Sequence, residues 1–325
     1  MVNKNKAKKL TMKTINPDAR LFVSLEKNPP VWWENLKNDK EIVIEIRSDK
    51  NKSYIDCYYN GGCILKGLEC DTKGNFKGKI HHKYIPIKFN INNDYIDYDF
   101  SNNNHKINYN NVNLVIPNVN NFDKKTLSLI KKQVEEYYPN DSEKGYQYKF
   151  IQKDPYFIDS EFQYNGFCGR DLRIDLVRID SHAKKIVFIE LKKISNPGLF
   201  NGGIEEQLNS YQCFINNFGS ELRKYYLDFI QAKKKLGLLS KEVLQIVEHN
   251  FSSYSVAQKP LLIIAGCTRK WIGNNARDIN NRIMKHALGC YYFGEVNKNS
   301  DIKKGRNRFL FNKRNHKKSQ KVSIN

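Results

Sequence analysis

The chain has 325 residues, and its 55 Lys and Arg against 34 Asp and Glu give a net charge of +21. This length predicts two domains with ordinary buried cores. No apolar run reaches the roughly 18 residues that a membrane-spanning helix needs, and the N-terminus lacks the apolar stretch of a signal peptide. We therefore expect a cytoplasmic protein with no membrane partner.

Much of the positive charge lies at the two ends. Residues 1–13 hold five Lys and residues 303–325 hold nine Lys or Arg, with no acid in either segment. These are 14 of the 21 net charges, which leaves +7 on the body. Basic ends bind nucleic acid by releasing counterions from phosphates. Two alternatives to nucleic-acid binding are that the ends only increase solubility, and that the Lys content reflects an AT-rich genome.

The cysteines have no spacing typical of a zinc site or a disulfide framework. An odd number in a chain of this length indicates free thiols, mostly as small core residues. They are Cys57, Cys63, Cys70, Cys168, Cys213, Cys267 and Cys290.

After a basic tail at 1–15, residues 16–122 predict a mainly β domain of unassigned role. Two prolines precede a short helix at about 31–36. Apolar and polar residues alternate as in strands over 41–46, 53–59 and 63–70, and glycine-containing turns at 60–62 and 72–75 indicate an antiparallel meander. Residues 90–121 contain 13 Asn and predict a loop or a weakly ordered hairpin.

The role of this first domain is open between DNA contact, target recognition and dimerisation, so a homodimer is one expected assembly. Several basic side chains could form a phosphate track along its sheet, and a solvated sheet face is the equal alternative. They are Arg47, Lys66, Lys77, Lys79, His81 and His82.

The second domain is predicted over 123–300, before a basic tail at 301–325. Apolar residues at helical spacing indicate a helix from Asp123 to about 138, and a second helix starts at 141 or 142. The remaining expected elements are strands at 156–164, 173–180 and 185–193, a helix around Gln207, helical structure over 220–249, a strand at 259–265, a helix at 276–288 and a strand at 291–296. This order predicts an α/β fold with a mixed central sheet flanked by helices.

Two of these strands carry acids inside apolar runs. Asp175 interrupts the first, and Glu190 interrupts the second, with Lys192 two residues further on. Side chains alternate along a strand, so Glu190 and Lys192 share a face. Burying such charges costs several kcal/mol unless each finds a partner. Two carboxylates and a lysine at the ends of paired strands suit metal-assisted phosphodiester hydrolysis, whereas an edge strand facing water is the plain alternative.

Asp175, fourteen intervening residues and Glu190-Leu191-Lys192 resemble the PD-(D/E)XK nuclease superfamily, which has the restriction-endonuclease-like fold. A helix with Glu143 precedes this motif, and a helix with Gln207 follows it. The resemblance covers about residues 123–218, with weaker support to 296, and does not cover the first 120. It implies a metal-dependent nuclease that hydrolyses DNA, with restriction or phage defence as a common use of the superfamily.

The resemblance also implies a metal site for Mg²⁺, or Mn²⁺ in its place. Asp175, Glu190 and the backbone carbonyl of Leu191 would be its ligands, and Glu143 would add one directly or through water. Glu161 competes with Glu143 as the upstream acid, although it could simply face solvent from its strand.

The remaining roles follow from the same resemblance and from charge. Lys192 would orient the attacking water, and Gln207 and Tyr211 would position water or phosphate. Arginines around the Asp175 strand could bind DNA phosphate or pair with Asp171 and Asp180; they are Arg170, Arg173 and Arg178. The alternative function is a non-catalytic nucleic-acid-binding protein on a nuclease-like fold.

Overall fold

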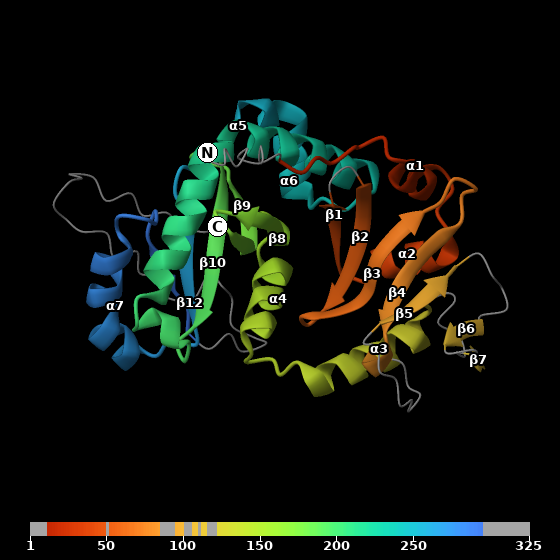
Figure 1. Ribbon diagram of the computed structural model, residues 1–325, viewed down its shortest axis with the longest axis horizontal. Coiled ribbons are helices and arrows are strands. Elements are labelled where there is room, and N and C mark those ends of the chain that lie inside the picture. Colours follow the sequence, from red (N-terminus) through yellow and green to blue (C-terminus); the bar gives the residue numbers. More distant parts are fainter. Residues whose placement is uncertain are drawn as a thin grey trace, which may run out of the picture.

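The structure is a computed structural model that describes residues 12–49, 52–84, 95–100, 106–109, 112–115 and 122–294. Nearly all of the basic tails predicted at 1–15 and 301–325 therefore lies outside the described residues. The described chain forms two lobes, each built on one β-sheet (Figure 1). In these parts of the chain, none of the helices has the length and apolar character to cross a membrane.

The N-terminal lobe is a five-stranded antiparallel sheet in the order β1-β2-β3-β4-β5, which confirms the predicted meander. Its strands are β1 (Val43–Asp49), β2 (Lys52–Tyr59), β3 (Gly62–Cys70), β4 (Phe76–His81) and β5 (Tyr95–Asp99). Helices α1 (Arg20–Lys27) and α2 (Val31–Asn38) accompany this sheet, and β6 (Lys106–Tyr109) pairs with β7 (Val112–Val115) as a hairpin.

The sequence predicted α2 and the first three strands but not α1, β4 or β5. The strand β5 lies inside the Asn-rich stretch, where Tyr95, Ile96 and Tyr98 supply the alternation of a strand. Pairing with β4 along its whole length overrides the weak strand preference of the surrounding asparagines.

The second lobe contains a six-stranded mixed sheet between helices, which confirms the predicted α/β class. Helix α3 (Lys124–Tyr137) packs on the first lobe, against β3 (Figure 1). The second lobe begins with α4 (Glu143–Lys153), β8 (Phe157–Phe167), β9 (Arg170–Asp180) and β10 (Lys185–Lys193). They are followed by α5 (Gly203–Lys235), α6 (Lys241–Asn250), β11 (Ser255–Val256), β12 (Leu261–Ala265), α7 (Arg269–Ile283) and β13 (Cys290–Tyr292).

The strand order is β13-β12-β10-β9-β8, with β11 beside β10. Strands β8, β9 and β10 are antiparallel, whereas β12 is parallel to β10 and β13 is parallel to β12. All the predicted strands are present, although residues 295–296 lie outside the described chain. Helix α7 starts seven residues before the predicted 276, because Thr268 caps it by accepting a hydrogen bond from the Trp271 backbone N–H at 3.1 Å.

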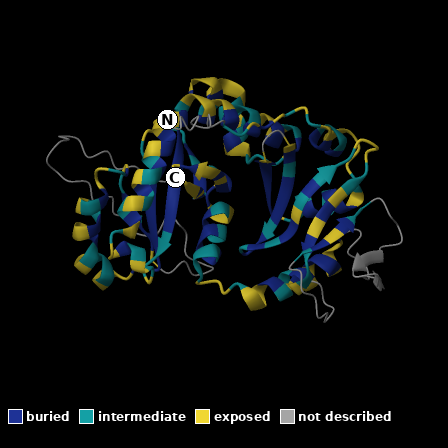
Figure 2. Ribbon diagram, in the orientation of Figure 1, coloured by how far each residue is buried: buried dark blue, intermediate teal, exposed yellow. Residues whose placement is uncertain are grey.

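Helix α5 links the two lobes. It packs along the second sheet, has non-helical dihedral angles only at Phe218 within its length, and then reaches β1 of the first sheet (Figure 1). Both sheets contain many buried residues (Figure 2), and one continuous apolar cluster contains residues of both lobes, from Ile46 and Leu68 to Phe188 and Phe229. The two lobes are therefore packed as one body around a shared core.

Candidate active site

The predicted catalytic residues lie where β9 and β10 separate. The last backbone pair between the two strands is Leu176 with Ile189. Asp175 and Glu190 are the next residues beyond this pair, one on each strand. Beyond that point, the Leu191 N–H donates to Asp175 Oδ2 at 2.9 Å instead of to a ladder carbonyl. A side chain thus supplies the partner that the ladder no longer provides, as a buried backbone donor requires.

Two helices hold the separated strand from opposite sides. Gln147 on α4 donates from Nε2 to the Asp175 carbonyl at 2.6 Å. Tyr211 on α5 lies with its hydroxyl against the carbonyl of Arg173. These contacts fix the backbone on both sides of Asp175, so the direction of its carboxylate is set by packing rather than by a loop.

Glu190 and Lys192 share a face, as the alternation predicted. Glu190 is completely buried and forms an ion pair with Lys192 through Oε1. Its other oxygen, Oε2, lies 2.8 Å from the Tyr211 hydroxyl, which in turn accepts a hydrogen bond from Gln207 Nε2 at 2.8 Å. The predicted Gln207 and Tyr211 pair therefore meets Glu190, with Tyr211 as the contacting residue.

The electrostatics of this set are dominated by burial. Burial raises the pKa of Glu190 well above its usual value, the Asp175 carboxylate raises it further, and Lys192 opposes both. Burial lowers the pKa of Lys192, but Glu190, Asp175 and Glu143 together outweigh that effect and raise it overall. Burial also raises the pKa of Tyr211, so its hydroxyl keeps its proton. Three acids thus act on one ammonium group.

The two candidates for the upstream acid have different surroundings. Glu143 begins α4, which Ser142 caps, and its Oε2 accepts the Lys193 backbone N–H at 3.3 Å. Glu161 is only 6% exposed and pairs with both Lys144 and Arg173, so the expectation that it faces solvent is wrong.

The backbone of Glu161 is strained. Its φ of 57° is in the left-handed region, which costs a residue with a side chain about 1–3 kcal/mol. Glu161 is paired with two cations, whereas the charge of Glu143 contributes to the raised pKa of Lys192.

The three predicted arginines occupy different environments. Arg170 is exposed and lies 3.9 Å from Glu206, and Arg173 pairs with Glu161. Arg178 is held by Asp154 at 2.8 Å and lies over the ring of Tyr156.

The alternative in which these arginines pair with Asp171 and Asp180 is wrong for the described residues. Asp171 accepts the Gly166 backbone N–H of β8, and Asp180 accepts two backbone N–H groups of the turn that follows it.

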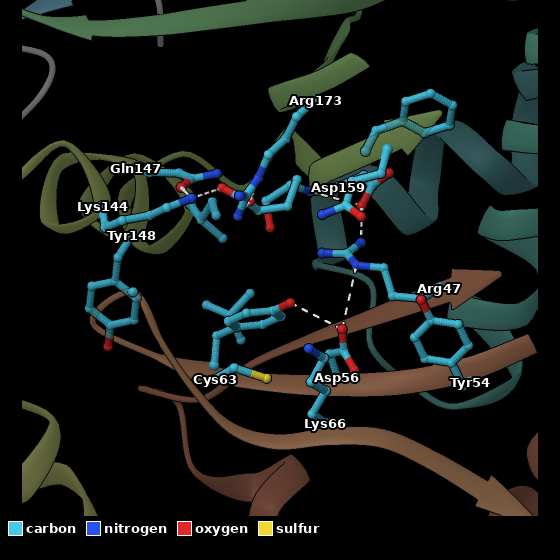
Figure 3. Close-up of a pocket in the computed structure, with 18 of the residues that line it drawn as sticks. Arg47, Tyr54, Asp56, Cys63, Lys66, Lys144, Gln147, Tyr148, Asp159 and Arg173 are labelled. Carbon is cyan, nitrogen blue, oxygen red and sulfur yellow. Dashed lines mark hydrogen bonds and ion pairs between the residues drawn. The ribbon is translucent and has the colours of Figure 1, made fainter. Parts of the chain in front are cut away.

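A cavity of about 350 Å³ lies between the lobes, beside the catalytic set (Figure 3). Lys144, Gln147 and Arg173 form its wall in the second lobe, and Arg47 and Lys66 come from the first sheet. Sequence analysis missed this site, since strands over 100 residues apart form it; the available signal was a charged Arg47 directly after the apolar start of β1.

The basic side chains of the first sheet do not form one phosphate track. Lys77 lies 3.8 Å from Asp71, Lys79 lies 3.7 Å from Asp97, and Arg47 is buried. The outer face of the strands thus carries paired, solvated charges, which agrees with the alternative given above for Lys77 and Lys79.

The expected cation needs oxygen ligands, and the residues near Lys192 can be judged against that need. Within the described ranges, no group of three or more His, Cys, Asp or Glu is arranged to hold a metal ion. Mg²⁺ commonly uses one or two carboxylates and retains several waters. The adjacent Asp175 and Glu190 fit that requirement, since Asp175 already raises the pKa of Glu190 by repulsion that a cation would relieve. All seven cysteines are free, as expected.

Comparison with known proteins adds no assignment. No protein-family model matches the chain, and no significantly similar curated protein or solved structure was found.

Proposed function

We propose that this chain is a metal-dependent nuclease that hydrolyses DNA phosphodiester bonds. The observation that carries the proposal is the convergence of Asp175, Glu190 and Lys192 where β9 and β10 separate. Two adjacent carboxylates suit a divalent cation, and a neighbouring ammonium suits the negative charge that develops on a phosphate during hydrolysis.

The proposal includes a restriction-endonuclease-like arrangement of the second lobe. Its support is the order of the elements: α4 precedes three consecutive antiparallel strands, α5 follows them, and β12 then lies parallel to β10. The candidate residues come from α4, β9, β10 and α5, which is the distribution that the sequence resemblance implies.

In this mechanism Asp175, Glu190 and the Leu191 carbonyl would hold Mg²⁺ or Mn²⁺, with Glu143 as a further ligand directly or through water. The bound metal would polarise the phosphate and make a bound water more acidic. Lys192 would turn from Glu190 to the phosphate and stabilise its developing charge.

Tyr211 and Gln207 are positioning residues. The Tyr211 hydroxyl keeps its proton and holds the Glu190 carboxylate.

A second candidate is a nucleic-acid-binding protein without catalysis. The observation in its favour is that both carboxylate oxygens of the fully buried Glu190 already have partners, Lys192 and Tyr211. A metal ion would have to displace or share these contacts.

Incubating supercoiled plasmid and linear DNA with and without Mg²⁺ separates the candidates, with Glu190→Gln as the inactive control. Nicking or linearisation of the plasmid indicates an endonuclease, and shortening of linear DNA alone indicates an exonuclease. Intact DNA, together with no heat of Mg²⁺ or Mn²⁺ binding in calorimetry, would reject the nuclease and leave the binding protein.

A further inference from the structure

The cavity between the lobes is distinct from the catalytic set. Its volume is about 350 Å³, and none of Asp175, Glu190 or Lys192 lines it. It nevertheless shares a wall with that set, because Arg173 lines the cavity and lies two residues before Asp175, or about 7 Å along the same face of β9. A ligand in the cavity would therefore lie close to the proposed reaction centre.

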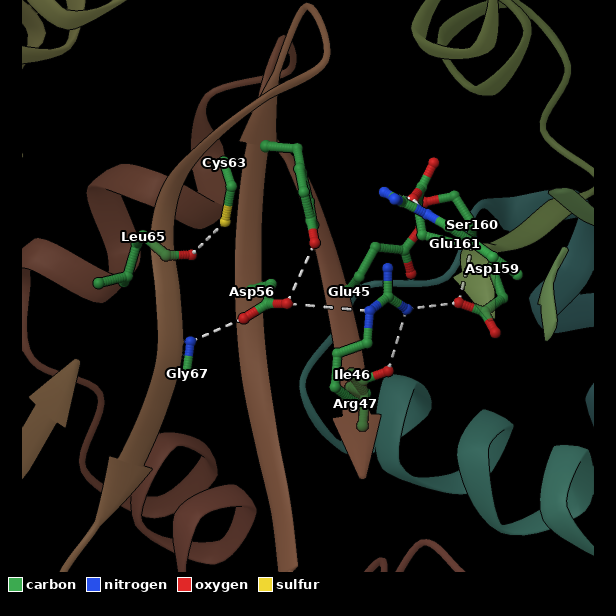
Figure 4. Close-up of polar contacts among 12 residues, drawn as sticks. Glu45, Ile46, Arg47, Asp56, Cys63, Leu65, Gly67, Asp159, Ser160 and Glu161 are labelled. Atoms are coloured by element: carbon green, nitrogen blue, oxygen red, sulfur yellow. Dashed lines mark hydrogen bonds and ion pairs between the residues drawn. The ribbon is translucent and has the colours of Figure 1, made fainter. Parts of the chain in front are cut away.

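Arg47 is a buried cation in the wall of this cavity. The residue is 9% exposed, and its Nη1 lies 2.7 Å from Asp159 Oδ1, while Nε lies 3.9 Å from Asp56 (Figure 4). Its Nη2 has no hydrogen-bond partner among the described residues. An unpaired buried guanidinium N–H is costly, and the positive charge of Arg47 favours an anion in the adjoining cavity.

The other charged side chains of the cavity make it positive overall. Five lining residues are cationic and three are acidic, which gives a net charge of +2. Lys144 and Arg173 are paired with Glu161 in the wall. Lys66 is exposed, and its Nζ lies 4.5 Å from the centre of the Tyr95 ring, so it can turn toward a bound anion.

The lining is also rich in aromatic rings. Six of its 23 residues are tyrosine, compared with 19 of the 325 residues in the chain. Five of these are only partly buried, and they are Tyr54, Tyr58, Tyr95, Tyr138 and Tyr148. Aromatic faces stack nucleic-acid bases without strong sequence preference, at about 1–3 kcal/mol per base. Cationic groups beside partly buried tyrosines thus combine the two elements that a nucleotide needs.

We infer that this cavity binds one nucleotide unit, with its phosphate at Arg47 and Lys66 and its base among the tyrosines. The volume is near the lower end of the range of about 300–1,000 Å³ for small-ligand sites, which suits a single nucleotide and not a duplex. The inference rests on the proposed function for its substrate class, since the unit can belong to a strand beside Asp175. A free nucleotide has the same chemistry.

Deoxyadenosine 5′-monophosphate is the probe, and its binding to the full chain is measured by NMR titration without divalent metal. We expect saturable binding, with deoxyadenosine weaker because it lacks the phosphate. Lys66→Ala should lower the affinity for the monophosphate by about tenfold, which is the effect of losing one charge-assisted contact. Arg47→Lys keeps the charge but loses the planar fork, and we expect a similar loss.

Lys79→Ala is the matched control. Lys79 lies opposite Lys66 in the β3–β4 pairing and is exposed, but it does not line the cavity, so its variant should bind as the wild type does. Absence of binding to the folded wild type would overturn the inference. Wild-type affinity in both Lys66→Ala and Arg47→Lys would overturn it equally, because the nucleotide would then bind elsewhere.

A single-stranded oligonucleotide distinguishes the source of the nucleotide. Displacement of the probe assigns the cavity to a unit of a strand, and failure to displace it assigns the cavity to a free nucleotide. The two proposals also fail separately. If the chain binds the probe but never cleaves DNA, the nuclease proposal is rejected and the nucleotide site is retained. If the chain shows metal-dependent cleavage but binds no probe, only the nucleotide site is rejected.

Discussion

Lys233 on α5 and Glu45 on β1 form a buried ion pair 2.8 Å long that joins the two lobes. Glu45 Oε1 also accepts the Ser160 hydroxyl at 3.0 Å, and Lys233 donates to the Ile158 carbonyl at 2.6 Å. The pair is thus connected to β8 as well as to β1 and α5. Its energetic weight lies less in the attraction between the charges than in the cost of leaving either one buried alone.

Removing one member of this pair should destabilise the whole molecule. Lys233→Ala leaves Glu45 buried without its cation and should lower the free energy of unfolding by about 3–5 kcal/mol. Lys235→Ala is the control. Lys235 lies two residues after Lys233 on the same helix but pairs with the exposed Asp18, so its loss should lower the free energy of unfolding by at most about 1 kcal/mol. Urea unfolding followed by circular dichroism measures both, and equal losses would contradict the argument.

Removing a catalytic carboxylate should abolish cleavage and preserve DNA binding. Asp175→Ala or Glu190→Ala removes a proposed metal ligand and also removes a negative charge that repels phosphate, so affinity for DNA should stay the same or increase. Cleavage and a binding isotherm should be measured on the same preparations. Cleavage by Glu190→Ala at the wild-type rate would show that the site is wrongly assigned.

The two adjacent lysines of β10 should differ sharply. Lys192→Ala should lower turnover by about two to three orders of magnitude, the effect of losing one transition-state donor. Lys193→Ala should be mild, since its ammonium pairs with the exposed Asp141 and its backbone N–H, which contacts Glu143, remains. Single-turnover rates distinguish these outcomes. Similar losses at both positions would mean that the facing of the side chains does not decide their roles.

Gly61 should tolerate no side chain. Its φ is +90°, and a Cβ there would lie 2.6 Å from Lys144 Cβ on the opposite lobe. Gly74 shares the conformation, with φ +88°, but has open space around it. Gly61→Ala should therefore lower the free energy of unfolding by about 1–3 kcal/mol more than Gly74→Ala does. This difference is the cost of overpacking alone, because both glycines share the same backbone conformation. Thermal and urea unfolding provide the comparison, and equal costs would mean that the lobes separate freely at this contact.

Removing the basic ends should weaken DNA binding without regard to sequence. A protein of residues 12–302 keeps Lys13. The removed segments contain 13 Lys and Arg and no acidic residue. If half of these contact phosphate, the slope of log affinity against log salt should flatten by about six units, at roughly 0.9 per contact. Measurements on two unrelated DNA sequences should change alike. An unchanged slope would assign binding to the folded body.

Local sequence patterns were sufficient for the strands that carry the catalytic set. The apolar alternation of β9 and β10 predicted both strands and the shared face of Glu190 and Lys192, because side-chain facing follows directly from strand periodicity. The capping residues Asp123 and Ser142 likewise marked the starts of α3 and α4.

Contacts between distant segments were not accessible in this way. Arg47 meets Asp159 across 112 residues, and Glu45 meets Lys233 across 188. No local period encodes such partners, so the cavity between the lobes and the burial of Glu161 could not be predicted. Arg178 was misassigned for the same reason, since its partner Asp154 lies before β8 and not on its own strand.

Helix α5 connects the catalytic set to the first lobe physically. Tyr211, before Phe218, touches Glu190, and Lys233, after Phe218, holds Glu45 of the other lobe. Any shift of the first lobe would reach the Glu190 carboxylate through this helix, unless the non-helical backbone at Phe218 absorbs it. The stiffness of the helix at Phe218 would therefore set how strongly a ligand between the lobes influences the geometry of the catalytic carboxylate.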